Sequence, residues 1–277
     1  MGEFSKSDLD YHKKVKIFHL NSAVQQRAFL LVIFVYSIVM FSLRTTALFL
    51  FLIFVAGIKA ADTFTVATFN VENYFFMKFG IRPVKPEISR AKVAEAVISI
   101  RPDVLALQEM GQREALVDLR RRLKVKGLEF PHHEWVIGPD PAIHLAVLSR
   151  FPITAHSHTN VMYLLDRRRF RVSRGFGEAR IRVNRNYEFT LFNTHLKSKR
   201  PVPQASEAEM RLCEALALRK IIEARLKVDA GANILVVGDL NDTPNAEPIR
   251  GLIGRRVPRL VDLRPLEGKG DHLLHPK

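Results

Sequence analysis

The feature that most constrains the fold is an apolar run that ends abruptly in a polar turn. The four residues from Ile234 to Val237 are apolar and mostly β-branched, which predicts a buried strand. Asp239 and Asn241 follow at the end of that strand. Residues two apart in an extended chain point to the same side, and a carboxylate beside an amide suits hydrated Mg²⁺ and a phosphate together. Because Asp and Asn also end strands as ordinary turn residues, this run alone leaves a catalytic and a purely structural interpretation open.

Beyond residue 62 the chain alternates predicted strands with predicted helices, without repeats. Two predicted strands are joined by a short polar turn, which indicates a hairpin. Strands in hairpins together with strands linked by helices favour mixed α+β layers over a purely parallel sheet. The predicted strands are Thr63–Phe69, Asp103–Leu107, His144–Ser149, Ala179–Val183, Tyr187–Asn193 and Asn233–Val237, and the predicted helices are Ile88–Ile100, Ala115–Leu123 and a helix that starts after Ser206 and runs to about Lys227.

Charge indicates the kind of partner. The 277 residues carry a formal net charge of +15, and only seven of the 43 Lys and Arg residues precede residue 61, so the basicity belongs to the folded part. Such a charge predicts a polyanionic partner, either nucleic acid or an anionic lipid surface. Cys213 is the single cysteine, which excludes an intrachain disulfide and a thiolate metal cluster.

The N-terminal segment predicts export. Between residues 28 and 58 the only charged residue is Arg44, and a run this long and apolar is typical of a hydrophobic helix that meets a membrane. Read from Met40, the sequence has the form of a cleaved signal peptide that ends near Ala60. Residues 1–61 are therefore predicted to be an extension plus a signal peptide or signal anchor, with the true start at Met40.

Both alternatives place residues 62–277 outside the cytoplasm. A cleaved signal peptide gives a periplasmic or extracellular protein. A retained segment gives a membrane-tethered one, because the basic residues before the apolar run would stay cytoplasmic.

Four predicted strands end in polar residues of one chemical kind. Asn70 follows the first, Glu109 the second and His195 the fifth, and Asp239 with Asn241 follows the last. Carboxylate and amide oxygens are hard ligands that suit Mg²⁺ or Mn²⁺, whereas zinc prefers more His or Cys. Each residue alone has a structural explanation, but their recurrence at strand ends indicates one site that acts on a phosphate.

Five motifs in this order resemble the endonuclease/exonuclease/phosphatase superfamily, the fold of deoxyribonuclease I and exonuclease III. The resemblance spans about Thr65 to Leu263. It implies a four-layer α/β/β/α sandwich with the site at one end of its two sheets, and Mg²⁺-dependent hydrolysis of a phosphoester. The motifs are TFNVEN at 68–73, LQE at 107–109, AVLSRFPI at 146–153, NTHLKS at 193–198 and GDLND at 238–242.

The resemblance assigns one group of residues to a metal ion. Asn70 and Glu109 correspond to the family's metal-site pair, with Glu109 as the direct ligand, and Glu72 would join them through water. Mg²⁺ is the implied cofactor, and Mn²⁺ is an alternative.

A second group is assigned to the phosphate. His195 corresponds to a histidine that stabilises charge on the phosphoryl oxygens, Asp239 to the residue that orients or deprotonates the attacking water, and Asn241 to one that holds a phosphate oxygen. Arg174 is similar to a phosphate-contacting arginine. Lys197 lies just after His195, where a cation would contact a phosphate.

Two further runs of basic residues are interpreted differently. The run at 120–126 is expected to be a solvated helix face. The run at 167–171 precedes a motif strand, and we expect it to contact phosphates.

At the C-terminus the family pattern continues with a terminal Asp-His pair and a last strand. Asp271 and His272 match the pair, but too few residues follow them for a strand. The 62–277 domain is therefore expected to lack its last strands, and its activity is left open.

The sequence thus favours an exported nuclease or phosphodiesterase, monomeric, that uses in-line attack of water on phosphorus. The alternatives are a phosphatase or phospholipase-type relative that acts on inositol phosphates or sphingomyelin, and a catalytically impaired domain that binds polyanions.

Overall fold

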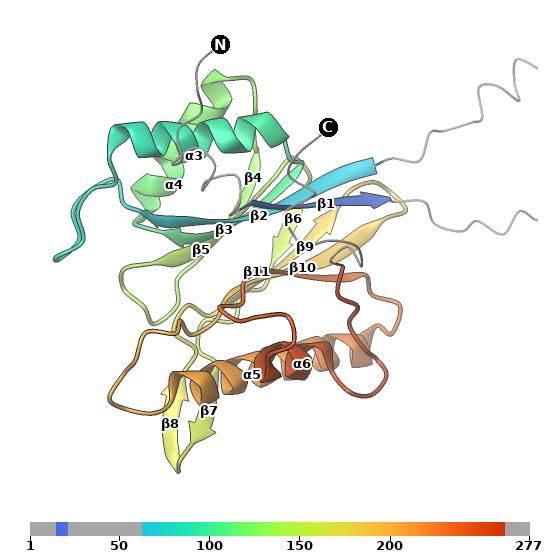
Figure 1. The fold of residues 1–277 in the computed structure, drawn as a ribbon. Coiled ribbons are helices and arrows are strands. Elements are labelled where there is room, and N and C mark those ends of the chain that lie inside the picture. Colours follow the sequence, from blue (N-terminus) through green and yellow to red (C-terminus); the bar gives the residue numbers. More distant parts are fainter. Residues whose placement is uncertain (1–14, 22–62, 264–277) are drawn as a thin grey trace, which may run out of the picture. The chain divides into compact units, whose positions relative to one another are not determined.

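A computed structural model of the chain describes residues 15–21 and 63–263 (Figure 1). The predicted signal segment and the Asp271–His272 pair lie outside the described residues. Within the described ranges, no helix is both long and apolar enough to cross a membrane.

The first sheet has five strands in the order β1-β2-β3-β5-β4. Strands β2 and β3 are parallel, whereas β5 is antiparallel to both β3 and β4. The strands predicted from the sequence are present and differ by a few residues at their ends. Strands β1 and β4 were not predicted. The bounds are β1 (Val15–Asn21), β2 (Thr63–Tyr74), β3 (Val104–Met110), β4 (His132–Val136) and β5 (His144–Ser149).

The second sheet has four strands in the order β11-β10-β9-β6. Strands β9 and β10 form the predicted hairpin, and β10 and β11 run parallel. A separate two-stranded sheet joins β7 and β8. The bounds are β6 (Ile153–Ala155), β7 (Met162–Leu165), β8 (Arg168–Arg171), β9 (Phe176–Arg182), β10 (Glu188–His195) and β11 (Ile234–Asp239).

Helices cover the outer face of each sheet (Figure 1). Helices α3 (Glu87–Ile100) and α4 (Arg113–Val125) pack on the first sheet through apolar residues such as Val97 and Leu119. Helices α5 (Glu207–Val228) and α6 (Glu247–Ile253) lie against the second sheet, where Leu218 packs near Phe192. The α/β/β/α sandwich predicted from the resemblance is confirmed.

Helix α5 begins where the sequence predicts it. The hydroxyl of Ser206 accepts a hydrogen bond from the backbone N–H of Glu209, at 3.4 Å. That contact satisfies one of the amides that a helix leaves unpaired in its first turn.

A buried amide joins the two sheets beneath their shared end. Asn193 is fully buried, and its Nδ2 donates to the carbonyl oxygens of Leu107 and Ala146 at 3.0 and 2.9 Å. Its Oδ1 accepts a hydrogen bond of 2.8 Å from Nε2 of Gln108. Gln108 is the residue before Glu109, and Asn193 is two residues before His195, so this contact fixes the two strand ends relative to each other.

The two basic runs lie in different surroundings, and the phosphate contact predicted for the run at 167–171 stays a prediction. The solvated-face interpretation is wrong for Arg122, whose side chain is only 15% exposed and binds Asp118 and Glu87. The arginines at 168, 169 and 171 are exposed on β8, and β8 belongs to the separate two-stranded sheet.

Candidate active site

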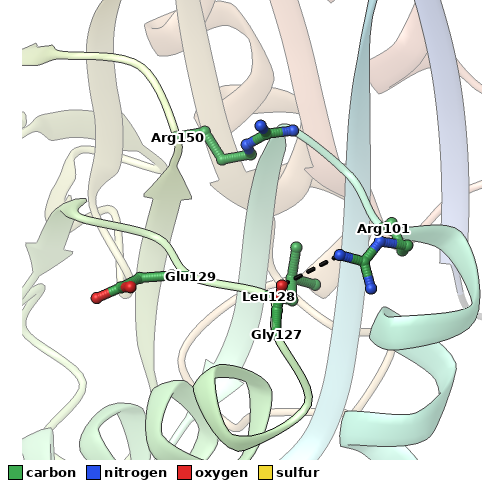
Figure 2. Close-up of a pocket in the computed structure, with 5 residues that line it drawn as sticks. All are labelled: Arg101, Gly127, Leu128, Glu129 and Arg150. Carbon is green, nitrogen blue, oxygen red and sulfur yellow. Dashed lines mark hydrogen bonds between the residues drawn. The ribbon is translucent and has the colours of Figure 1, made fainter.

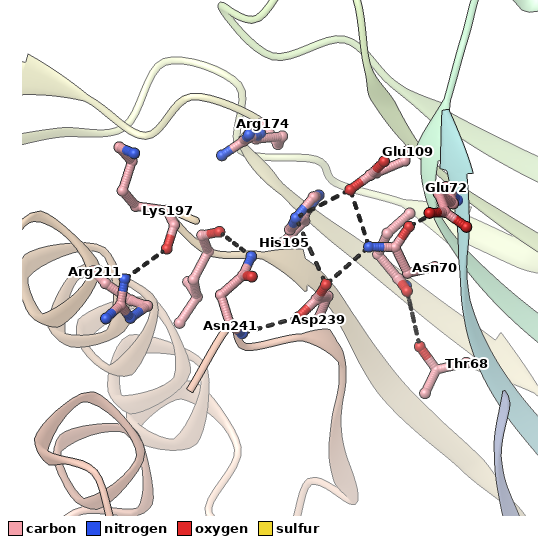
Figure 3. Close-up of polar contacts among 12 residues, drawn as sticks. Thr68, Asn70, Glu72, Glu109, Arg174, His195, Lys197, Arg211, Asp239 and Asn241 are labelled. Carbon is pink, nitrogen blue, oxygen red and sulfur yellow. Dashed lines mark hydrogen bonds and ion pairs between the residues drawn. The ribbon is translucent and has the colours of Figure 1, made fainter. Parts of the chain in front are cut away.

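Strand pairing brings the predicted site residues together. In the parallel pair β10–β11, His195 lies directly opposite Asp239. In the parallel pair β2–β3, Asn70 lies opposite Gln108, the residue before Glu109. The carboxyl ends of strands from both sheets therefore meet in one cluster (Figure 3).

Asn70 connects the two acidic residues. Its Nδ2 donates to Oε1 of Glu109 at 3.1 Å and to Oδ2 of Asp239 at 2.8 Å. The Asp239 carboxylate also accepts the backbone N–H of Asn241 at 2.9 Å, and Nδ2 of Asn241 donates to the carbonyl of Leu196 at 2.9 Å. Both carboxylates are thus held in fixed orientations while remaining partly exposed, at 19% for Glu109 and 29% for Asp239.

His195 lies between the two carboxylates. Its Nε2 is 3.9 Å from Oε1 of Glu109 and 3.8 Å from Oδ2 of Asp239, distances too long for direct hydrogen bonds. Burial, and then the positive charge of Arg174, lower the pKa of His195 below its usual value, although the two carboxylates act in the opposite direction. The ring is therefore neutral at neutral pH.

Unusual backbone geometry accompanies the cluster. Glu72, Asn73, Glu109 and Asn241 have φ values of 53°, 54°, 61° and 52°, in the left-handed region that non-glycine residues rarely adopt. Such conformations cost free energy and concentrate at functional sites. The Glu109 carboxylate helps to fix this geometry, since its Oε2 accepts the N–H of Asn73 at 3.0 Å.

Gly238 is required where β11 reaches the site. Its φ is 132°, and a Cβ at this position would lie 1.9 Å from the carbonyl oxygen of Thr194. Only glycine permits the close approach of β10 and β11 that sets His195 beside Asp239.

Two cations lie on the other side of His195 from the acidic residues. The Arg174 side chain is only 12% exposed, and its Nε and Nη1 have no hydrogen-bond partner among the described residues. Nε lies 3.6 Å from Oδ2 of Asp140. A buried guanidinium with unpaired N–H groups is suited to an anionic ligand.

The ammonium of Lys197 binds its own loop, and the phosphate contact predicted for it stays a prediction. Its Nζ donates to the carbonyl oxygens of Ser198 and Arg200, at 3.1 and 2.8 Å. Burial, followed by the charge of Arg174, lowers the pKa of Lys197. Its ammonium therefore holds the loop after β10 and adds positive charge to this side of the site.

Comparison with known proteins agrees with this geometry. The model of the Endonuclease/Exonuclease/phosphatase family matches residues 67–271. The chain belongs to this family. The family model thus covers every predicted site residue.

Solved structures share the fold at low identity. Sphingomyelinase C from Streptomyces griseocarneus is 19% identical, with a TM-score of 0.52 over 68% of this chain and 68% of that chain. A variant of beta toxin from Staphylococcus aureus with bound magnesium ions is 16% identical, with a TM-score of 0.52 over 69% of this chain and 71% of that one. No curated protein sequence matches the chain.

The family's divalent metal fits the carboxylate at the end of β3. Glu109 offers carboxylate oxygens there, Asn70 directs its Nδ2 to one of them, and Oδ1 of Asn70 accepts the N–H of Glu72. No group of three or more His, Cys, Asp or Glu residues suited to a metal occurs in the described part of the chain. A set with a single direct carboxylate is typical of Mg²⁺, which keeps several waters and takes substrate phosphate oxygens as ligands.

Glu72 lies at the periphery of this group. Its side chain is exposed, and its backbone N–H donates to Oδ1 of Asn70 at 2.9 Å. The water-mediated role predicted for Glu72 stays a prediction, as do the individual roles of the other site residues.

Sequence reasoning missed two charged residues of α5 beside the site. Arg211 and Glu214 are 4% and 0% exposed. A signal was present, because Glu214 falls in the i, i+4 series of Met210, Leu218 and Ile222, all of which are buried. A carboxylate in an apolar helical stripe indicates a buried charge with a specific task.

A basic hollow of about 240 Å³ lies elsewhere on the domain (Figure 2). Arg101 precedes β3 and Arg150 follows β5, where these antiparallel strands pair Val104 with Ser149. Glu109 is near the opposite end of β3. This hollow is therefore separate from the candidate active site.

Proposed function

We propose that the protein is an exported, Mg²⁺-dependent phosphodiesterase that acts on nucleic acid, with its site in residues 62–277. Family membership supports a phosphoester hydrolase. The observation that carries the finer proposal is the division of the site into two halves around His195. Glu109 and Asp239 supply negative charge on one side. On the other side, Nε and Nη1 of Arg174 have no hydrogen-bond partner among the described residues, and Nε lies 3.6 Å from the Asp140 carboxylate.

The acidic half would hold the metal ion. Glu109 and Asn70 would be its protein ligands, with Glu72 reached through water. When bound, the ion would stabilise the negative charge that develops on the phosphoryl oxygens.

The remaining residues would position the phosphate and the water. Arg174 would bind one phosphoryl oxygen, and Asn241 a second. Asp239, fixed by Asn70 and by the N–H of Asn241, would orient the attacking water and accept its proton. The neutral ring of His195 would donate an N–H to the phosphoryl oxygen as water attacks in line with the leaving group.

Charge favours nucleic acid as the substrate. The chain has a net charge of +15, and Lys199 and Arg200 follow the site on the same loop as Lys197. Phosphates that flank the scissile bond would bind these cations without regard to sequence. An exported nuclease would meet extracellular or periplasmic nucleic acid.

A phosphodiester of a lipid is the second candidate. It is favoured by the similarity in fold to a sphingomyelinase C. Export would give such an enzyme access to an outer membrane surface, and the same residues would perform the same hydrolysis.

One set of assays separates these substrates. The protein would be incubated with plasmid DNA, RNA, sphingomyelin vesicles and a chromogenic phosphodiester, each with Mg²⁺ and with chelator. We expect cleavage of nucleic acid with Mg²⁺ only. Cleavage confined to sphingomyelin would select the lipid candidate, and binding of DNA without cleavage of any substrate would leave only a polyanion-binding domain.

A matched pair of variants tests the site. Asp239→Asn should lower kcat by about 10³-fold or more, because it removes the group that accepts the proton, with little change in Tm. Asp166→Asn makes the same chemical change in an exposed turn whose φ of 49° asparagine also tolerates, so its rate should be unchanged. An Asp239→Asn enzyme with near-normal kcat would reject the assignment.

A further inference from the structure

Helix α5 directs two buried charges towards the basic half of the site. Arg211 and Glu214 lie one turn apart, and neither has a part in the chemistry proposed above. Burying a charge costs several kcal/mol unless partners compensate for it. The partners of both residues are therefore informative.

Glu214 binds two separate segments through their backbones. Its Oε2 accepts the N–H of Lys197 at 2.6 Å, and its Oε1 accepts the N–H of Ser173 at 3.5 Å. Ser173 is the residue before Arg174, and Lys197 follows His195 by two residues. One carboxylate thus joins the loop that carries Arg174 to the loop that leaves β10.

Arg211 extends the same arrangement to a third segment. Its Nη1 donates to the carbonyl oxygen of Lys197 at 3.0 Å (Figure 3). Its Nε donates to Oδ2 of Asp242 at 2.8 Å. Lys197 is consequently held at its N–H by Glu214 and at its carbonyl by Arg211. Asp242 is the neighbour of Asn241, so the β11 turn is held by the same helix.

Glu214 acts on the nearby cations without binding their charged groups. The charges of Arg174 and Lys197 both favour its ionised form, yet it accepts its hydrogen bonds from the backbone amides of Ser173 and Lys197. The guanidinium of Arg174 keeps its Nε and Nη1 without a hydrogen bond among the described residues. Glu214 therefore places the cation while leaving its donors for a ligand.

We propose that Glu214 is a positioning residue that sets Arg174 and the Lys197 loop at the distance needed to bind the substrate phosphate. This inference rests on the proposed phosphodiesterase function. It adds a residue that acts through Arg174 and touches neither the substrate nor the metal. Arg211, one turn away on α5, holds the Lys197 loop from its carbonyl side.

Alternative explanations of the burial are weaker. A purely structural carboxylate would be paired with side-chain cations, as Asp118 is in α4. Burial raises the pKa of Glu214 to about 7, against the opposing effect of its amide partners and Arg174. An apolar side chain at this position would avoid that cost, and the retained charge therefore indicates a role beyond packing.

Glu214→Gln is the first test, because it keeps the shape of the side chain and removes its charge. We expect KM for the chromogenic phosphodiester to rise about tenfold, with kcat changed less than threefold. The Mg²⁺ concentration for half-maximal rate should be unchanged, because Glu109 and Asn70 are not in contact with Glu214. Glu209→Gln, an exposed carboxylate in the first turn of the same helix, is the matched control and should match the wild type.

Binding of inorganic phosphate tests the inference without catalysis. By calorimetry, Glu214→Gln should weaken phosphate binding about tenfold, and Arg174→Ala should weaken it at least as much. In the double variant the Glu214 effect should vanish, because positioning matters only while Arg174 is present. Additive losses would show that Glu214 acts independently of Arg174, and would overturn the proposal.

The outcomes distinguish this inference from the proposed function. A wild-type domain that binds phosphate but cleaves nothing would reject the function, and the calorimetric cycle would still decide the role of Glu214. A domain that cleaves with an unchanged KM in Glu214→Gln would reject the positioning role alone. If Glu214→Gln does not fold, Arg211→Lys replaces it. An unchanged affinity for phosphate in Arg211→Lys would overturn the proposal that α5 positions the basic half of the site.

Discussion

Asp118 and Glu214 are both buried carboxylates on outer helices, one over each sheet, but their surroundings are opposite. Asp118 accepts hydrogen bonds from the Tyr74 hydroxyl, Arg121 and Arg122, each at 2.8 Å. Burial alone would raise its pKa, but these hydrogen bonds lower the pKa of Asp118 to about 2. The charge in the α3–α4 layer is neutralised within that layer.

Glu214 in the α5 layer is bound by amides, and its neighbouring cations stay separate. Its pKa is raised to about 7 by burial. The two layers thus use buried charge in different ways. In the α3–α4 layer the charge is paired and contributes to stability, whereas in the α5 layer it reduces stability and leaves Arg174 able to bind an anion.

The largest effect should come from breaking the paired charge. Asp118→Ala would leave Arg90 and Arg122, which are 11% and 15% exposed, without their shared buried partner. We expect the free energy of unfolding to fall by about 3 to 5 kcal/mol, measured by urea denaturation. The activity of the remaining folded protein should match the wild type. A stable variant, or a folded one with impaired KM, would contradict the contrast between the layers.

The two carboxylates should give stability profiles of opposite slope. For Asp118 the folded pKa lies below the usual 3.8, so its contribution is present above that pH and is lost as pH falls towards 2. For Glu214 the folded pKa lies above the usual 4.5, so stability is greatest below about 4.5 and falls as pH rises through 7. Each effect should be on the order of 2 to 3 kcal/mol.

Urea denaturation over a series of pH values measures both slopes. In Glu214→Gln, the free energy of unfolding should no longer fall between pH 4.5 and 7. The decrease in stability below pH 4, which comes from Asp118, should be unchanged. If the slope in that range persists in Glu214→Gln, the buried carboxylate of α5 is not its origin.

The amide that joins the sheets should affect both stability and activity. Asn193→Ala would remove the side-chain donor to the carbonyls of Leu107 and Ala146 and the acceptor for Nε2 of Gln108. Gln108 would keep its hydrogen bonds with Thr68. We expect about 2 kcal/mol of destabilisation together with a fall in kcat/KM, since Gln108 and Asn193 precede Glu109 and His195. Asn186→Ala, in the exposed β9–β10 turn, is the control and should change neither quantity. If Asn193→Ala lowers stability but leaves kcat/KM unchanged, the contact between the sheets does not position the site.

The sequence predicted the parts of the fold that depend on local pattern. The long apolar runs of β3, β5 and β11 and the capped start of α5 form where periodicity and capping residues predict them. Strand β4, His132–Val136, carries three polar residues in five and is only partly buried. Its extended conformation depends on pairing with β5, a long-range contact that no local pattern encodes.

The candidate site divides in the same way. Asn70, Glu109, His195 and Asp239 could be grouped because parallel strand ends share an edge. The orientation of Lys197, whose Nζ binds loop carbonyls, depends on how the chain turns after β10. The path of this loop depends on the packing of α5. The sequence pattern therefore placed Lys197 near the site but did not determine where its side chain points.

The smallest effect should come from the basic hollow at the other end of the first sheet. Arg150 is 57% exposed and pairs with Asp103 at 2.7 Å, an arrangement worth less than about 1 kcal/mol when solvent screens it. Arg150→Ala should therefore change the free energy of unfolding by less than that, and leave kcat and KM for the chromogenic phosphodiester unchanged.

The comparison with Arg174→Ala is informative because both variants remove one arginine. Arg174 is buried near His195, and its Nε and Nη1 have no hydrogen-bond partner in the described part of the chain, so its loss should raise KM. Arg150 is exposed and pairs with Asp103. Equal effects of the two variants on KM would show that net positive charge, and not the placement of Arg174 by α5, determines phosphate binding.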